Sequence, residues 1–424
     1  MNSNHQGEAT RRGFLAGVAG AGTAWLLSDP SGGGRCFGAA GAKGADMVKG
    51  IERSVVWNGR AGGTTWFHPR ACMVPGDERP TAFMTLQSIT GSDVFGHVHA
   101  SVSTDLGKTW TDPAKIRALG RHPARDGLTE GVCDVVPEYH PKTRTVLAMG
   151  HNVYYNKKGT LARPQLERYP VYVVRGLDGA FSEAKKLVWD DPRGTAIYTC
   201  GCAQRVTLDD GDILVPLSFG PKGRAARSVG SALCGFDGKT LTIKRCGNEL
   251  KSNVKRGLLE PSLAAFEGRY YMTIRAEDNR GHVSSSPDGL HWDKQRPWCW
   301  DDGEPLTMST TQQRWLPHSD ALHLVYTRKA AKNVNVFRWR APLYMARVDV
   351  KTLRLIRTTE RVVLPLIGDG VNSAAHVARM GNFHTVAATP DESWVTVGEC
   401  LPHDGWRGDL LMARIRWARP NRST

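Results

Sequence analysis

The sequence feature that most constrains this fold is a turn motif with Ser, Asp, Gly and Trp at fixed spacing. Residues 103–110 read Ser-Thr-Asp-Leu-Gly-Lys-Thr-Trp, the pattern S-x-D-x-G-x-x-W. The serine and aspartate side chains can bond to backbone groups inside a hairpin, the glycine supplies positive φ, and the tryptophan packs beneath the turn. A version shorter by one residue, S-x-D-G-x-x-W, spans residues 286–292. The two motifs therefore predict two β-hairpin turns of one kind, far apart in the chain.

Between and beyond these turns, short apolar or alternating runs are separated by Gly, Asp, Asn and Pro. Examples are residues 81–86, 97–103, 270–274 and 321–326. Runs of this length and pattern are typical of β-strands, and helical periodicity beyond one turn is absent after the N-terminal segment. Many short strands joined by turns predict an all-β sandwich, barrel or propeller.

The turn motif resembles the Asp box of the sialidase (neuraminidase) superfamily, and the resemblance covers most of the chain after residue 42. It implies a β-propeller in which each box joins the third and fourth strands of a blade and has a structural role. At ~40–60 residues per four-stranded repeat, the roughly 380 residues available give six or seven blades. We expect one domain over residues 43–424, a six-bladed sialidase-like β-propeller, with seven blades as the alternative.

The same resemblance extends to charged residues around the turns. Arg70 precedes Asp93 by 23 residues, and the first turn begins ten residues after Asp93. Glu260 is followed by a strand that ends in Arg275, and the second turn comes directly afterwards. By resemblance, Arg70 and Arg275 would bind a substrate anion, Asp93 would be the general acid/base, and Glu260 would activate the nucleophile.

The chemistry of a sialic acid explains these residue types. Its carboxylate sits on the anomeric carbon, where an arginine cluster binds it through charge-assisted hydrogen bonds. A carboxylate nucleophile would be repelled there, so sialidases use a tyrosine activated by a glutamate. Residues 370–376, where the superfamily places this tyrosine, contain none, and Tyr344 comes earlier in the chain. Arg340 is the expected third arginine, with Arg338 and Arg328 as alternatives.

Histidines add a second set of candidate ligands. His97 and His99 alternate along one predicted strand and so share a face, and His151 lies in a polar stretch. We expect His97, His151 and Tyr344 to contribute to substrate binding together with Arg70, Arg275 and Arg340. A site rich in His, Tyr and Arg would also suit a lyase that removes a proton beside a carboxylate.

The formal net charge of +15 is consistent with a solvated basic surface or with a field that attracts acidic sugars. Nucleic acid is not expected as a partner, because Lys and Arg are scattered and no nucleic-acid motif occurs. The nine cysteines fit no compact disulfide scaffold. Cys200 and Cys202 have no second Cys/His pair at zinc-site spacing, so we predict no metal site and no cofactor.

The first residues resemble an export signal. Residues 10–15, Thr-Arg-Arg-Gly-Phe-Leu, resemble a twin-arginine motif, followed by an apolar run over 16–27 and a Gly/Ala-rich stretch to 42. The apolar run is shorter than the ~20 residues that span a bilayer. We expect residues 1–42 to be a twin-arginine signal peptide, and the mature protein to be periplasmic or secreted, without stable membrane insertion.

Three functions follow from these observations. The first is an exported glycoside hydrolase that resembles exo-α-sialidases and removes an acidic or sialic-like terminal sugar from glycans. The second is a polysaccharide lyase or atypical glycosidase on the same scaffold, which would use His, Tyr and Arg. The third is a non-catalytic propeller that binds a glycan. Fold alone does not separate them.

Overall fold

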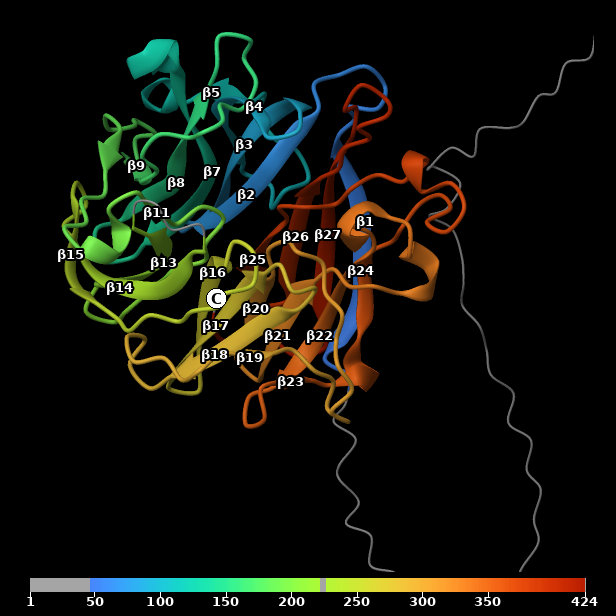
Figure 1. The fold of residues 1–424 in the computed structure, drawn as a ribbon. Helices are drawn as coiled ribbons and strands as arrows, with labels where there is room; N and C mark the ends of the chain where they lie inside the picture. The colour runs from blue at the N-terminus through green and yellow to red at the C-terminus, as the bar shows by residue number, and fades with distance from the viewer. Residues whose placement is uncertain (1–45, 222–225, 424) are drawn as a thin grey trace, which may run out of the picture. The chain divides into compact units, whose positions relative to one another are not determined.

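The computed structural model describes residues 46–221 and 226–423. The predicted signal peptide, residues 1–42, lies outside this part of the chain. The described strands form six antiparallel sheets, and the described helical segments are 3-10 turns of three residues (Figure 1). The predicted all-β, six-bladed propeller is confirmed, and the alternative of seven blades is wrong. None of the described helices has the length and apolar character needed to cross a membrane.

The first three blades follow one another along the chain, and each runs from an innermost strand outward. Blade 1 contains β2 (Trp66–Val74), β3 (Thr81–Gly91), β4 (Val94–Ser103) and β5 (Ala114–Lys115). Blade 2 contains β7 (Thr129–His140), β8 (Thr145–Tyr155), β9 (Pro170–Arg175) and β10 (Lys185–Lys186), with β6 (His122–Pro123) on the other edge of β7. In blade 3, β11 (Ile197–Thr199) and β12 (Val206–Thr207) both pair with β13 (Ile213–Gly220), which is followed by β14 (Ser228–Phe236) and β15 (Leu241–Cys246).

The last three blades complete the ring. Blade 4 contains β16 (Leu258–Phe266), β17 (Arg269–Ala276), β18 (Gly281–Ser286) and β19 (Arg296–Pro297). Blade 5 contains β20 (Arg314–His318), β21 (Ala321–Tyr326) and β22 (Leu343–Asp349), which pairs with both β23 (Arg354–Leu355) and β24 (Arg361–Leu364). Blade 6 contains β25 (His384–Thr389), β26 (Glu392–Gly398), β27 (Leu410–Trp417) and β1 (Val48–Trp57). The 3-10 turns are η2 (Arg117–Leu119), η3 (Arg125–Gly127), η4 (Pro192–Gly194), η5 (Ala331–Asn333), η6 (Phe337–Trp339), η7 (Arg357–Thr359) and η8 (Ala374–His376).

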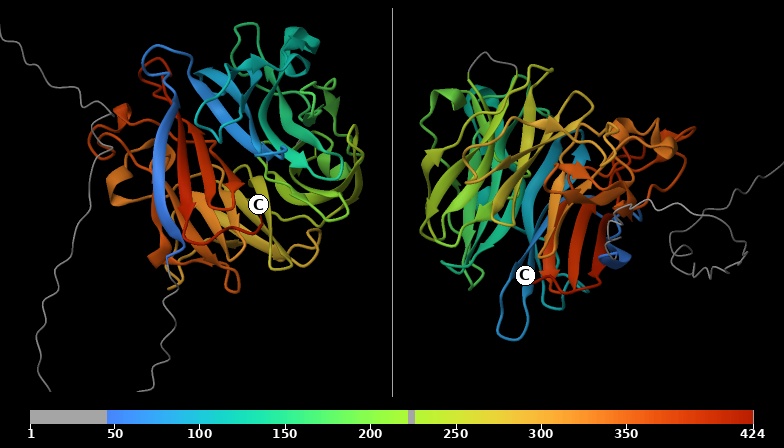
Figure 2. Two further views of the ribbon diagram at one scale, coloured as in Figure 1. Left: turned by 180° about the vertical axis from the view of Figure 1, so that it is seen from behind. Right: turned by 90° about the horizontal axis from the view of Figure 1, so that it is seen from below.

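Blade 6 joins the two ends of the described chain. Its outermost strand β1 pairs antiparallel with β27 from Val48 opposite Trp417 to Trp57 opposite Leu410. Figure 2 shows β1 (blue) beside the red strands of the C-terminal part. The ring is therefore closed by backbone hydrogen bonds between strands from opposite ends of the sequence.

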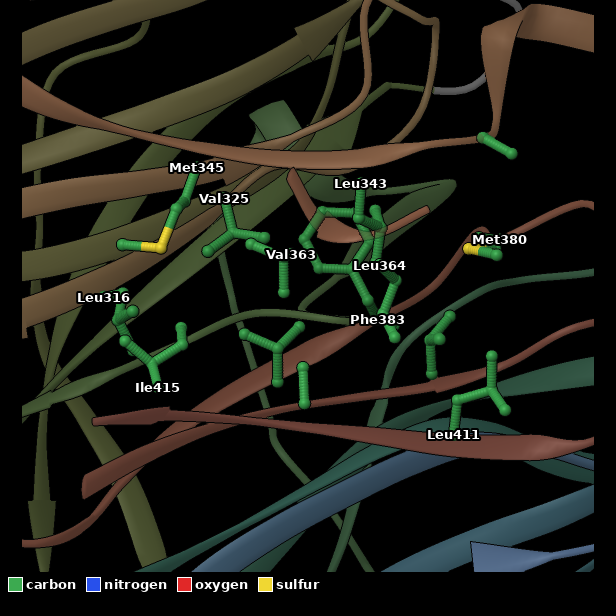
Figure 3. Packing of buried hydrophobic residues seen from close by; sticks show 14 of the residues in the cluster. Leu316, Val325, Leu343, Met345, Val363, Leu364, Met380, Phe383, Leu411 and Ile415 are labelled. Atoms are coloured by element: carbon green, nitrogen blue, oxygen red, sulfur yellow. The ribbon is translucent and has the colours of Figure 1, made fainter. Parts of the chain in front are cut away.

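The hydrophobic core is divided among the wedges between neighbouring blades. The wedge between blades 5 and 6 buries side chains of β20, β21, β22 and β27 around Phe383, which is fully buried (Figure 3). Separate clusters fill the wedges between blades 2 and 3 and between blades 4 and 5. Full burial of a Leu, Val or Phe side chain contributes roughly 1.5–3 kcal/mol, so these wedges hold the blades in place.

The two motif turns have matching hydrogen bonds. In the 103–110 turn, Asp105 Oδ1 accepts from the backbone N–H groups of Lys108 and Thr109 at 3.0 and 2.9 Å. In the 286–292 turn, Asp288 Oδ1 accepts from the N–H groups of Leu290 and His291 at 2.9 and 2.8 Å. Both turns follow the third strand of a blade and lead to its short fourth strand, so they stabilise the outer edge of the propeller.

Candidate active site

The innermost strands share one backbone irregularity. Five residues in or just before these strands, one in each of five blades, have positive φ: His68, Asp134, Cys202, Glu260 and Asn382. In blades 1, 2 and 4 the positive-φ residue lies within a shift of the strand register. Such a bulge re-aims the side chains beside it. It brings polar groups of several blades together near the channel axis.

Asp134 lies at the centre of one polar group. Its Oδ1 atom is 2.6 Å from Arg70 Nη2, 2.8 Å from Cys202 Sγ and 3.4 Å from His68 Nε2. Burial alone would raise the pKa of Asp134, but the neighbouring His68 and Arg70 charges lower it below its ordinary value. Burial lowers the pKa of His68 to about 4, so His68 is neutral at pH 7. Arg70 is therefore the cation that keeps Asp134 ionised at that pH.

Arg70, a predicted anion-binding residue, is paired with Asp134 inside the protein. Its side chain is fully buried and lies against Asp134, where Nη2 also contacts Cys202 Sγ at 3.1 Å. Its Nε and Nη1 atoms have no hydrogen-bond partner among the described residues. The role of Arg70 in binding a substrate anion stays a prediction.

Glu260 and Arg275 form a second polar group. Glu260 Oε1 is 2.5 Å from Arg275 Nη1, and Arg275 Nε donates to Thr310 at 3.3 Å. The Glu260 side chain is 27% exposed, but its Oε2 atom is buried. Its Oε2 atom has no hydrogen-bond partner within the described part of the chain. Glu260 thus holds an arginine with one oxygen, while its other oxygen is buried without a protein partner among the described residues.

Further arginines gather around this pair. Burial, followed by the charges of Arg275 and Arg338, lowers the pKa of Arg340 to about 10. Burial, followed by the charges of Arg275 and Arg256, also lowers the pKa of Arg338. Each of these charges affects another, so the four arginines lie close together. We call them the arginine group: Arg256, Arg275, Arg338 and Arg340. Gly381 leaves room for it, since a Cβ atom there would lie 2.7 Å from Arg340 Nη1.

The arginine group contains more arginines than there are carboxylates paired with them. Arg256 forms an ion pair with Glu277, and Arg275 with Glu260. Arg338 and Arg340 have no ion-pair partner within residues 46–221 and 226–423 as described. The group therefore carries an excess of positive charge, which favours an anionic ligand. The sequence pointed to Arg275 and Arg340 with Arg338 as an alternative, but nothing in it singled out Arg256.

Asp93 lies at the tip of the hairpin between β3 and β4. It is exposed and has a φ of 58°. Its charge raises the pKa values of Arg256 and Arg338, as one of the smaller causes in each case, so the hairpin tip lies near the arginine group. Asp93 also acts on the buried Cys133 thiol. The structure thus places Asp93 within electrostatic reach of Arg256 and Arg338.

The remaining predicted residues divide between the channel and the outer blades. His151 reaches the channel, where its Nε2 atom is 3.4 Å from Cys133 Sγ, and burial lowers its pKa to about 3. His97 lies on the third strand of blade 1, near Lys115 and Gly120. The ring of Tyr344 stacks on Tyr326 at 6.1 Å inside the wedge between blades 4 and 5. The structure therefore does not bring His97 or Tyr344 to the group around Glu260.

No tyrosine hydroxyl of the described residues hydrogen-bonds to the Glu260 carboxylate. In blade 6, Asn382 precedes the innermost strand, and its amide contacts His68 Nε2 of blade 1. The groups shown around Glu260 are thus arginines and a threonine hydroxyl near Arg275.

The described chain is a sialidase-like six-bladed propeller. Comparison of the sequence with protein-family models and with curated proteins returns no match. Among solved structures, a protein of unknown function from Dyadobacter fermentans aligns with a TM-score of 0.60 at 14% identity, over 87% of this chain and 100% of that chain. Trypanosoma rangeli sialidase in complex with sialic acid aligns with a TM-score of 0.57 at 16% identity, over 87% of this chain and 59% of that chain.

A Hadza microbial sialidase gives a TM-score of 0.59 at 14% identity, over 86% of this chain and 68% of that chain. This chain thus spans about three fifths of the trypanosomal sialidase and about two thirds of the microbial one. At these identities, the likeness establishes the shared fold.

Proposed function

We propose that this protein is a glycoside hydrolase that removes an acidic, sialic-like terminal sugar from a glycan. The observation that carries the proposal is the cluster of Arg275, Arg338 and Arg340 beside Glu260, with the exposed Asp93 within electrostatic reach of Arg338. Three guanidinium groups can bind one carboxylate through charge-assisted hydrogen bonds. Sialidase-like neighbours in fold support a glycosidase but do not specify its substrate.

The residues suggest how hydrolysis would proceed. With the sugar carboxylate held by the arginines, Asp93 donates a proton to the glycosidic oxygen as the bond to the anomeric carbon breaks. A water molecule forms the new bond to that carbon, and the Glu260 carboxylate takes its proton. Because no tyrosine bonds to Glu260 in the described residues, we propose direct attack by water, which inverts the anomeric configuration.

The test is turnover of fluorogenic sialosides and of other acidic glycosides, with proton NMR of the first product formed. Asp93→Asn and Glu260→Gln should each lower kcat at least about 100-fold, the range for loss of a general acid or base. Asp126→Asn is a matched control, since Asp126 is also an exposed aspartate with positive φ. An enzyme that turns over none of these substrates, or one insensitive to Asp93→Asn, would contradict the proposal.

A lyase is the second candidate, and the position of His151 favours it. His151 is neutral at pH 7 and lies in the channel beside Asp134, so it could remove a proton next to an arginine-bound carboxylate. Cleavage would then produce an unsaturated sugar that absorbs in the ultraviolet and would be lost in His151→Gln. A glycan-binding protein without activity would show affinity for acidic sugars but no turnover of either kind.

The cellular location is a separate proposal. Residues 10–15 and the apolar run after them support export through the twin-arginine route. Replacing Arg11 and Arg12 by Lys should retain the protein in the cytoplasm, which cell fractionation would show. Equal amounts of the wild type and of this variant outside the cytoplasm would argue against this route.

A further inference from the structure

Three potential metal ligands meet on two neighbouring strands of blade 2. Cys133 Sγ, one carboxylate oxygen of Asp134 and a ring nitrogen of His151 all lie within 4.8 Å of one another. Cys133 Sγ is 3.4 Å from His151 Nε2 and 3.8 Å from Asp134 Oδ2. None of the three was assigned to a metal from the sequence, because their spacing matches no Cys/His pair motif.

The backbone explains why these side chains converge. Consecutive residues of a regular strand point to opposite faces, but Asp134 has a φ of 59° and lies in a register shift of β7. This bulge turns Cys133 and Asp134 toward the same space. His151 on β8 is directly opposite Cys133 in the strand pairing. Cys133 and His151 are thus held by paired backbone, and Asp134 lies in the bulge next to them.

The distances fit a coordination polyhedron. Metal–sulfur bonds of ~2.3 Å and metal–nitrogen bonds of ~2.0–2.1 Å in a tetrahedral site give ligand–ligand edges of about 3.5 Å. The observed separations of 3.4 and 3.8 Å bracket that length. A metal ion could therefore enter between these ligands without a large movement of any side chain.

The surroundings direct one oxygen of Asp134 to this space. Its Oδ1 atom is occupied by Arg70 at 2.6 Å and by Cys202 at 2.8 Å, which leaves Oδ2 on the side of Cys133. Partners that orient a metal ligand in this way are typical of protein metal sites. Because Arg70 already balances the Asp134 carboxylate, the Cys133 thiolate supplies the negative charge that a dication needs.

We propose that Cys133, Asp134 and His151 bind one divalent transition-metal ion, with Zn²⁺ as the best match to a mixed sulfur, nitrogen and oxygen ligand set. The described residues supply three ligands, as in sites that keep a fourth position for water or a ligand oxygen. The proposal goes beyond the proposed hydrolysis, in which no metal takes part.

The test uses the purified protein, treated with a chelator and then titrated with Co²⁺ alone. Binding should reach about one Co²⁺ per chain and produce the near-ultraviolet absorption of a thiolate–cobalt bond together with the visible bands of tetrahedral cobalt. Added Zn²⁺ should remove both. Cys133→Ser should lose the thiolate band, and His151→Gln should weaken Co²⁺ binding at least about 10-fold, the effect of losing a ligand or its support.

Cys299→Ser is the matched control, because Cys299 is a free, partly exposed thiol on blade 4. It should keep the full spectrum. Circular dichroism of each variant distinguishes loss of metal binding from loss of the fold. If Cys133→Ser is unstable, Asp134→Asn provides a second ligand variant. A wild type without a thiolate–cobalt band, or a band that survives Cys133→Ser, would overturn the proposal. Either result would leave the arginine cluster and its glycosidase test unaffected.

Discussion

Nη2 of Arg70 lies 2.6 Å from Oδ1 of Asp134, and the two residues come from the innermost strands of adjacent blades. The Arg70 side chain is enclosed by protein on all sides, since its relative exposure is 0%. The ion pair therefore joins blades 1 and 2 beneath the candidate site.

Arg70→Met should destabilise the protein because it leaves the mostly buried Asp134 carboxylate without its cation. Breaking one side of a buried ion pair costs about 3–5 kcal/mol, and urea denaturation of chelator-treated protein would measure the free energy of unfolding. The double variant Arg70→Met, Asp134→Asn should recover part of this loss. A single variant as stable as the wild type would show that the pair does not hold the blades together.

The arginine cluster should determine affinity for an acidic substrate. Arg338→Met removes one charge-assisted hydrogen bond, worth about 1.5–3 kcal/mol, and should raise KM about 10- to 100-fold for an acidic sugar. The same variant should have little effect on binding of a neutral analogue. Arg361→Met is a control on blade 5, where Arg361 pairs with Asp46 at 2.6 Å. Equal effects on acidic and neutral sugars would contradict a carboxylate site.

Trp292 in the second turn should affect stability and not catalysis. Its ring is buried, and its Nε1 atom donates to Ser231 on blade 3 at 2.8 Å. Trp292→Ala should lower the free energy of unfolding by about 3–5 kcal/mol, whereas Trp292→Phe should lower it less. KM measured well below the unfolding temperature should stay unchanged, and a change in KM alone would assign the turn to the site.

Stability should also depend on pH through buried histidines. Burial lowers the pKa of His68 to about 4 and of His151 to about 3, from an ordinary value of 6.5. Below about pH 6.5 the unfolded chain binds these protons and the folded chain does not. The free energy of unfolding should therefore be highest above that pH and fall as the pH drops toward 4. The Asp134 contribution is lost at lower pH, as the carboxyl of the unfolded chain binds a proton near its ordinary pKa of 3.8 while the folded chain stays ionised.

Urea denaturation at several pH values would measure this slope. His68→Gln should flatten it, whereas His122→Gln, at a side chain that is 61% exposed, should leave it unchanged. A wild-type stability that is constant between pH 6.5 and 4 would contradict neutral, buried histidines.

The blades could be predicted from the sequence because turns and strand alternation depend on local backbone chemistry. Asp105 and Asp288 organise their turns through neighbours within four residues. Glu260 and Arg275 are also close in the chain, at facing ends of β16 and β17. The positive φ of His68 and Asp134 could not be read from the sequence. It changes which side chains face the channel.

Asp134 illustrates this limit most directly. It stands in the run Val132 to Val136, where strand alternation gives no reason to select one polar residue. Its partners Arg70 and Cys202 are 64 and 68 residues away in the chain. Only the packing of blades 1, 2 and 3 side by side makes them neighbours, so a search for motifs at fixed spacing could not find the group.

The pairing of β1 with β27 has a consequence for how the protein is made. During synthesis, β1 emerges first but has no partner until the last strand leaves the ribosome. Until then β1 has an unpaired edge, which is a site for pairing with other chains. A polypeptide that ends before residue 410 should therefore aggregate and should not form a smaller stable propeller.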